Sequence, residues 1–192
     1  MSDKKIILKT IKIGLVGDST SGKNDIVNSF FNIEFDKDML STIGSDKLET
    51  KYALKNGKEI KAIIWDTAGN KRFISVALKT IKSVQGIILL FDITKRATFE
   101  IINLWLEEIK KNLDDPCMVL LGNNIHVEEE KWEVTREEAN KFAKSKNLEY
   151  FEVSAKTKQG IDEGFSYIIH KTYDKIEKKT ETKEEKKICK IF

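Results

Sequence analysis

The chain has 192 residues, of which 40% are apolar and 34% are charged, and its formal net charge is +3. This length predicts one globular domain with a sizeable core, and so small a net charge gives no argument for nucleic-acid binding. Two cysteines far apart in the chain do not make a disulfide framework, which fits a reducing compartment. We expect a soluble or tethered protein, because the N-terminus does not resemble a signal peptide and the longest apolar run, residues 87–91, is too short for a membrane span.

Strand-like and helix-like segments alternate along the chain. The predicted strands are residues 8–16, 51–54, 60–65, 86–91, 117–121 and 149–153. The predicted helices are residues 23–31, 97–112 and 160–175, with a further helix that begins at Thr135. Asn56-Gly57 favours a tight hairpin between the second and third strands. The alternation predicts a doubly wound α/β domain in residues 1–175, with a mostly parallel sheet, one antiparallel hairpin strand and helices on both faces.

The stretch Gly17-Asp18-Ser19-Thr20-Ser21-Gly22-Lys23-Asn24 lies between the first strand and the first helix. In such a unit the glycines let backbone N–H groups turn inward, the helix start adds partial positive charge, and the lysine reaches the outer phosphates. The pattern predicts a P-loop NTPase-type sheet whose phosphate-binding residues are Asp18, Ser19, Thr20, Ser21, Gly22 and Lys23. The alternative is a tight turn that only caps a helix.

A second motif, Trp65-Asp66-Thr67-Ala68-Gly69, follows the third predicted strand. An acid at a strand end beside a phosphate loop can bind Mg²⁺ through a water, and the Gly69 N–H can meet a terminal phosphate. Alone, Asp66 could simply cap a turn. Beside the phosphate loop, the motif predicts a metal and phosphate site.

Further motifs follow these two in order along the chain. They are Ser41-Thr42-Ile43-Gly44, Arg72-Phe73, the run from Gly86 to Thr94, Phe99-Glu100 with Trp105, and Glu152-Val153-Ser154-Ala155-Lys156. Together with residues 17–24 and 64–69 they make the chain resemble the Rab branch of the Ras superfamily of small GTPases, from about residue 9 to about residue 175.

This resemblance implies a monomeric switch protein that binds GTP or GDP together with Mg²⁺. At matching positions, Thr42 is expected to ligate the metal and Asp66 to hold a metal-bound water. Phe35 stands where the family stacks an aromatic ring on guanine, although it could instead be core at a helix end. Asn123 and Ser154-Ala155-Lys156 match the two base-contacting motifs.

Two departures from the family pattern concern the metal and the attacking water. Asn24 replaces the Ser or Thr that ligates Mg²⁺, and although its amide oxygen can coordinate, the side chain is longer and its NH₂ group repels a cation. Asn70 replaces the catalytic, water-orienting glutamine and is one methylene shorter. A misplacement of about 1 Å can cost about a hundredfold in rate, so we expect a defective catalytic position.

Two further departures concern the base. Asn124 replaces the lysine that covers the base and braces the phosphate loop, and His126 replaces the aspartate that accepts two N–H bonds from guanine. A neutral imidazole offers one acceptor and an imidazolium none. Losing two charged hydrogen bonds predicts a loss of guanine preference on the order of a hundredfold or more.

Partners and location follow from the resemblance in the same way. Effectors and regulators would bind through residues 36–83, a surface on which only Trp65 remains of the aromatic trio that Rabs use, with Lys47 and Thr80 at the other two places. Cys189, four residues from the end in Cys189-Lys190-Ile191-Phe192, is at a prenylation position. Lysines in the flexible tail, residues 176–192, would assist anchoring on the cytosolic face of intracellular membranes. The alternative is an accidental cysteine in a solvated tail.

Two functions remain open on this basis. The first is a Rab-like guanine-nucleotide switch in membrane and vesicle traffic, with impaired binding and hydrolysis. The second is a pseudo-GTPase, a membrane-tethered binding scaffold that holds nucleotide without switching or holds none. A small-molecule phosphotransferase is disfavoured by the motifs at residues 66–69 and 154–156.

Overall fold

The computed structural model describes residues 9–33, 45–70 and 74–188, without the side chains of residues 45, 46, 80 and 183–188. Within these ranges six strands form one sheet in the order β2-β3-β1-β4-β5-β6. The strands are β1 (Lys9–Gly17), β2 (Ser45–Ala53), β3 (Glu59–Thr67), β4 (Gly86–Asp92), β5 (Cys117–Asn123) and β6 (Glu149–Glu152). β2 pairs with β3 antiparallel and every other pairing is parallel, which confirms the predicted sheet.

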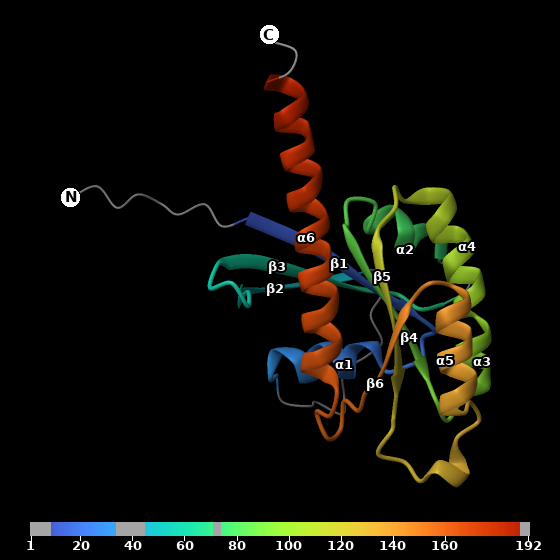
Figure 1. Cartoon of the computed structure of the whole chain (residues 1–192). Coiled ribbons are helices and arrows are strands. Elements are labelled where there is room, and N and C mark those ends of the chain that lie inside the picture. The colour runs from blue at the N-terminus through green and yellow to red at the C-terminus, as the bar shows by residue number, and fades with distance from the viewer. Residues whose placement is uncertain (1–8, 34–44, 71–73, 189–192) are drawn as a thin grey trace.

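Helices cover both faces of this sheet (Figure 1). They are α1 (Lys23–Phe31), α2 (Ile74–Thr80), α3 (Arg96–Glu100), α4 (Ile102–Asn112), α5 (Arg136–Ser145) and α6 (Ile161–Ile188), with a short 3₁₀ helix, η2 (Glu129–Lys131). α1 and α6 pack on one face of the sheet and α2 to α5 on the other, and each of these two groups covers one hydrophobic cluster. β4 is buried along its whole length because its side chains alternate between the two clusters.

Several predicted boundaries were wrong. The helix expected over residues 97–112 is two helices, α3 and α4, because at Ile101 the backbone tightens to ψ −15°. α2 was not predicted, although its buried Ile74, Ala77, Leu78 and Ile81 have helical spacing. α6 continues to Ile188, beyond the expected end at Lys175.

Contacts just beyond Lys175 explain why α6 continues past its expected end. Glu177, in the segment expected to be frayed, forms an ion pair with Lys9 of β1, whose ammonium also lies over the Tyr173 ring. These contacts tie the continuing helix to the sheet. The boundary between a domain and a flexible tail at residue 175 stays a prediction.

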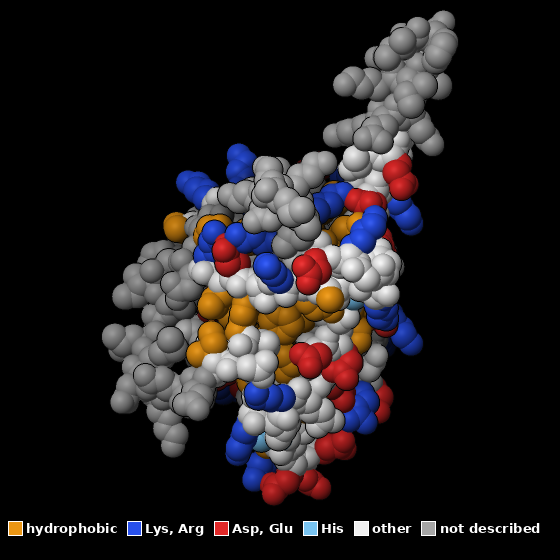
Figure 2. All heavy atoms as spheres, turned by 90° about the vertical axis from the view of Figure 1, so that its left-hand side faces the viewer, with side chains coloured by type: hydrophobic (Ala, Val, Ile, Leu, Met, Phe, Trp, Pro, Cys, Tyr) orange, Lys and Arg blue, Asp and Glu red, His pale blue; other side chains and the backbone are white. Residues whose placement is uncertain are grey.

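The surface at the β2 side of the molecule combines apolar and charged groups. Figure 2, which turns this side toward the reader, shows hydrophobic side chains gathered among lysines and acids. Partly buried Leu48 and Tyr52 of β2 and Phe30 and Phe31 of α1 pack against the cluster under α1 and α6. None of the helices in the described ranges has the length and apolarity needed to cross a membrane.

Candidate functional site

The phosphate loop, residues 17–24, connects the end of β1 to the start of α1. Both of its glycines are required by the backbone. A Cβ on Gly17 would lie 2.2 Å from the carbonyl oxygen of Leu90 in β4, and Gly22 caps α1 in the left-handed region with φ 85°. The loop therefore has a fixed path from strand to helix.

Side chains within the loop also fold onto its own backbone. The Asp18 carboxylate accepts hydrogen bonds from the N–H and the hydroxyl of Thr20, both at 2.9 Å. The Ser21 hydroxyl and N–H donate to the Asp18 carbonyl at 2.8 and 3.2 Å. These bonds close a compact turn that precedes Lys23.

Lys23 and Gly69 meet at the opening of this loop. Lys23 is buried, and its ammonium donates to the carbonyls of Asp18 at 2.7 Å and Gly17 at 3.3 Å. Burial lowers the pKa of Lys23, although nearby Asp66 and Asp18 oppose the shift. A Cβ on Gly69 would lie 2.4 Å from both the Lys23 ammonium and the Ser19 N–H nitrogen. The structure thus brings the two predicted phosphate motifs together, with the Lys23 ammonium and the Ser19 N–H beside Gly69.

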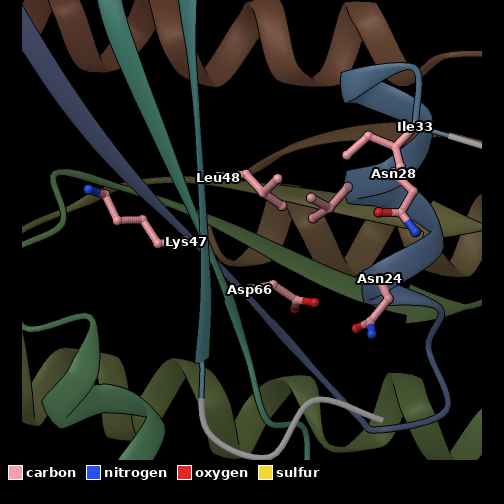
Figure 3. A pocket seen from close by; sticks show the side chains of 7 residues that line it. Asn24, Asn28, Ile33, Lys47, Leu48 and Asp66 are labelled. Atoms are coloured by element: carbon pink, nitrogen blue, oxygen red, sulfur yellow. The ribbon is translucent and has the colours of Figure 1, made fainter. Parts of the chain in front are cut away.

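Asp66 and Asn24 line a cavity of about 310 Å³ between α1 and the β2–β3 pair. Figure 3 shows the Asp66 carboxylate, at the end of β3, directed toward the side of the cavity that carries Asn24. Val27, Asn28, Ile33, Lys47 and Leu48 complete the lining. Mg²⁺ takes one or two protein oxygens and keeps several waters, so a carboxylate and an amide oxygen are a suitable donor set for it.

The base-side motifs converge on Asn123, at the end of β5. Its side chain is buried, donates to the Ser21 carbonyl at 3.1 Å and accepts from the N–H groups of Asn124 and Ala155 at 2.8 and 3.3 Å. One amide therefore joins the phosphate loop to both predicted base-contacting segments. Lys156 follows, exposed to solvent.

His126 reaches the same region from the loop after β5. Its Nδ1 lies 2.9 Å from the Ser154 hydroxyl, and that hydroxyl also accepts from the Thr157 N–H at 3.1 Å. Ser154 is buried whereas His126 is exposed. The imidazole that replaces the family's aspartate at this position therefore has one nitrogen engaged within the protein.

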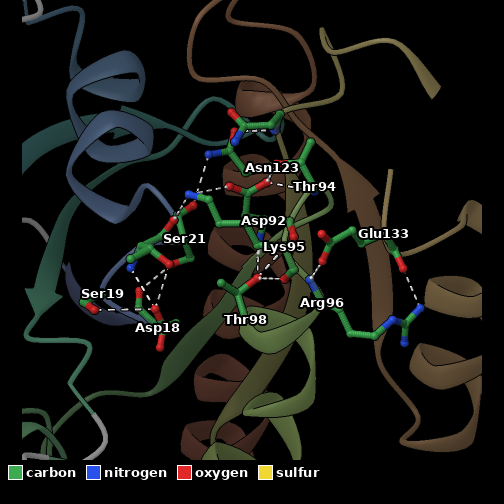
Figure 4. Close-up of polar contacts among 12 residues, drawn as sticks. Asp18, Ser19, Ser21, Asp92, Thr94, Lys95, Arg96, Thr98, Asn123 and Glu133 are labelled. Atoms are coloured by element: carbon green, nitrogen blue, oxygen red, sulfur yellow. Dashed lines mark hydrogen bonds and ion pairs between the residues drawn. The ribbon is translucent and has the colours of Figure 1, made fainter. Parts of the chain in front are cut away.

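Sequence reasoning missed three charged residues beside the loop. Asp92 is the last residue of β4 and Lys95 lies in the segment after it, and Lys95 bonds to both Asp92 and the Thr20 carbonyl (Figure 4). Asp25, in the first turn of α1, brings a carboxylate oxygen within 3.7 Å of the point that a Cβ on Gly22 would occupy, and burial raises its pKa. The Asp92-Ile93-Thr94 sequence after a buried strand was a signal for the first of these.

Of the remaining predicted site residues, the structure describes some and leaves others outside the described ranges. Asn70 is exposed, next to Gly69. Lys47 and Trp65 are register partners in the β2–β3 pair, so two of the three predicted effector positions are neighbours. Phe35, Thr42 and Cys189 lie outside the described residues.

Comparison with known proteins gives a consistent set of similarities. The family model described as the Ras family matches residues 12–174. The chain is 35% identical over 167 residues to Ras-related protein Rab-18-B of Danio rerio, covering 86% of this chain and 80% of that protein. It is 36% identical over 171 residues to Ras-related protein Rab-18 of Caenorhabditis elegans, covering 88% and 83%. It is 35% identical over 170 residues to Ras-related protein Rab11A of Lotus japonicus, covering 88% and 74%.

Proposed function

The chain belongs to the Ras family as a Rab-like small GTPase, and on this premise we propose that it is a guanine-nucleotide-binding switch protein of intracellular membrane traffic with weakened metal and base contacts. The observation that carries the proposal is the meeting of Lys23, the Ser19 N–H and Gly69 at the phosphate loop. This arrangement supports phosphate binding independently of the base-side changes.

At the phosphate end, Lys23 would hold the outer phosphates of the nucleotide. Its ammonium rests on two loop carbonyls and its pKa is lowered by burial, so an arriving anion would offset the cost of keeping this charge buried. Gly69 would contribute its N–H to the terminal phosphate. Mg²⁺, when bound, supplies charge stabilisation to the phosphates.

Asn24 and Asp66 are the described residues that would hold this metal. Their oxygens suit Mg²⁺, but an amide binds it less well than a hydroxyl of the right length because its NH₂ group is a donor. We therefore infer that Mg²⁺ adds less to nucleotide affinity here than in relatives with Ser or Thr at this position.

Hydrolysis would be slow for a separate reason. The reaction is attack of water on the γ-phosphate, in which the protein positions the water and stabilises developing charge. Asn70, one methylene shorter than glutamine, holds its amide too close to its own backbone to orient that water. A deficit of about a hundredfold follows from a misplacement near 1 Å.

Base recognition is the weakest part of the proposed site. The His126 imidazole, engaged with Ser154, supplies no carboxylate acceptor for the two guanine N–H groups. Asn123 connects the phosphate loop to the two predicted base-contacting segments, but alone it is not sufficient for specificity toward guanine. We infer little discrimination between guanine and adenine nucleotides.

A pseudo-GTPase scaffold is the second candidate. Asn24, Asn70, Asn124 and His126 all depart from the family pattern, and the metal, water and base positions that they alter are parts of the nucleotide site that this pattern implies. Such a protein would keep the fold and its partner surface, including Lys47 and Trp65, without a nucleotide cycle.

Calorimetric titration of the full-length protein separates the proposed switch from a scaffold that holds no nucleotide. GDP, GTP and ATP are each titrated with and without Mg²⁺, and Lys23→Ala serves as the control that removes the phosphate contact. The proposed switch predicts micromolar or weaker binding of all three nucleotides, lost in the control. Absence of binding by any nucleotide supports the scaffold, and Mg²⁺-dependent submicromolar GTP binding contradicts the inferences on Asn24 and His126.

Membrane attachment is a separate part of the proposal. We propose a prenyl group on the Cys189 sulfur, assisted by the lysines that precede it. Mass spectrometry of the protein purified from its own cells tests this. A mass increase equal to an isoprenoid on Cys189 supports the anchor, and an unmodified thiol contradicts it.

A further inference from the structure

Two consecutive carbonyls of the phosphate loop are held by side chains from other parts of the sheet. The Lys95 ammonium lies 3.2 Å from the Thr20 carbonyl oxygen, and the Asn123 amide lies 3.1 Å from the Ser21 carbonyl oxygen. In Figure 4 both side chains approach the loop from the ends of β4 and β5. Because N–H and C=O point in opposite directions across a trans peptide unit, fixing a carbonyl also fixes the direction of the next N–H.

The Lys95 ammonium is held in place by a buried carboxylate, that of Asp92. It lies 3.1 Å from a carboxylate oxygen of Asp92, whose side chain is only 1% exposed. The backbone N–H of Lys95 donates to the Asp92 carbonyl at 3.0 Å, and the Thr98 hydroxyl donates to the Lys95 carbonyl at 2.7 Å. The ammonium is therefore anchored by β4, which runs parallel to β1 next to the loop.

Asp92 is kept charged for this contact. Burial alone would raise its pKa, but hydrogen bonds from Thr94, Asn124 and Lys95 together lower the pKa below its ordinary value. The Asn124 side chain is thus directed to Asp92. The cation that reaches the Thr20 carbonyl of the phosphate loop comes from Lys95, in the segment after β4.

We propose that Lys95 is a positioning residue that braces the phosphate loop, and that it takes over the bracing expected of a lysine at Asn124. The consequence for ligand binding rests on the proposed function, because the braced loop must be the one that holds nucleotide phosphates. A loop already fixed in its binding geometry loses less conformational entropy when the phosphates arrive. A charge-assisted hydrogen bond that is half exposed is expected to be worth about three- to tenfold in affinity.

The chain offers a matched control for this contact. Lys111 forms an ion pair with Glu108 at the same i,i+3 spacing as Lys95 with Asp92, but on the exposed surface of α4. The variants are Lys95→Met, Lys95→Arg and Lys111→Met. Arginine keeps a cation and several donors at the same position, whereas methionine keeps only the length of the side chain.

Hydrogen exchange of the full-length protein without nucleotide tests the brace itself. Lys95→Met should increase exchange severalfold in peptides covering residues 17–24, whereas Lys95→Arg and Lys111→Met should leave it within twofold of the parent. An increase confined to residues 92–98, or an equal increase in Lys111→Met, overturns the proposal.

GDP titration of the same variants tests the consequence for binding. Lys95→Met should weaken GDP binding about three- to tenfold and Lys95→Arg by less than twofold. Unchanged GDP affinity in Lys95→Met overturns the link to nucleotide binding. If the parent protein binds no GDP, the proposed function fails, while the exchange experiment still decides whether Lys95 braces the loop.

Discussion

The phosphate end and the base end of the candidate site are built in different ways. At the phosphate end, the loop path is fixed by backbone packing: Gly17 lies against β4, Gly22 is left-handed, and Lys23 is buried. At the base end, His126 is an exposed side chain that meets Ser154 through one hydrogen bond. Backbone geometry of the first kind cannot change without disturbing the fold, whereas a side chain of the second kind can be exchanged at little cost. The difference supports the proposal that this chain keeps its phosphate loop while its base contacts are weakened.

The largest expected effect comes from a substitution that disturbs the backbone of the phosphate loop at Gly17. Gly17→Ala would place a Cβ 2.2 Å from the Leu90 carbonyl oxygen, so β1 and β4 must separate. We expect roughly 3 kcal/mol or more of lost unfolding free energy, measured by urea denaturation. Gly57→Ala is the control, because Gly57 has φ +78° but open space around it and should cost only about 1 kcal/mol. Similar costs for the two variants would contradict the claim that packing fixes the loop.

Next in size is the restoration of base recognition. His126→Asp supplies the missing carboxylate, and two charged hydrogen bonds to guanine are worth about a hundredfold in affinity. We expect GDP affinity to rise by roughly ten- to a hundredfold while ADP affinity stays unchanged. Competition between the two nucleotides measures the ratio directly. The exposed position of His126 predicts unchanged stability, and an equal gain for ADP would show that the effect is not base recognition.

A smaller effect is expected at the metal position. Asn24→Ser replaces the amide with a hydroxyl, and we expect Mg²⁺ to strengthen GDP binding about tenfold more in the variant than in the parent. Asn28→Ser is the matched control, since Asn28 lines the same cavity from the next turn of α1. The measurement is GDP affinity across a Mg²⁺ titration. An equal response in both variants would mean that residue 24 does not contact the metal.

The smallest expected effect is the pH dependence of stability that comes from Asp92, the buried carboxylate that holds Lys95. Its pKa is lowered in the folded state, so it contributes stability above its unfolded pKa and loses this contribution as pH falls through the folded pKa. Asp92→Asn should therefore be less stable than the parent at neutral pH, with a difference that shrinks as the pH falls below about 4. Thermal unfolding across this range measures it. Asp115→Asn, which removes an exposed pair with Lys175, should show a smaller difference, and a constant difference for Asp92→Asn would contradict the sign.

The sheet and the phosphate loop could be predicted from the sequence because local signals determine them. Apolar runs such as residues 86–91 favour buried strands, and Asn56-Gly57 favours a tight turn. The two loop glycines permit backbone conformations and close contacts that other residues rarely allow. α2 had a helical spacing that was overlooked, and the end of α6 depended on the Lys9–Glu177 pair, which joins distant parts of the chain.

The site was predictable only where a motif is contiguous. Lys95 and Thr20 are far apart in sequence, and their contact exists only because β4 lies beside β1. The hydrogen bond between His126 and Ser154 likewise depends on the pairing of β5 with β6. No local pattern specifies such pairs, so sequence reasoning could name the altered positions but not what they now contact.

The central claim is that an intact phosphate end is combined with weakened metal and base contacts at Asn24 and His126. The most direct test is GDP binding to the full-length double variant Asn24→Ser, His126→Asp, with hydrogen exchange used to verify that its fold is unchanged. The account predicts a gain in GDP affinity larger than that of either single variant, together with stronger dependence on Mg²⁺. A correctly folded double variant with no gain in affinity would contradict it.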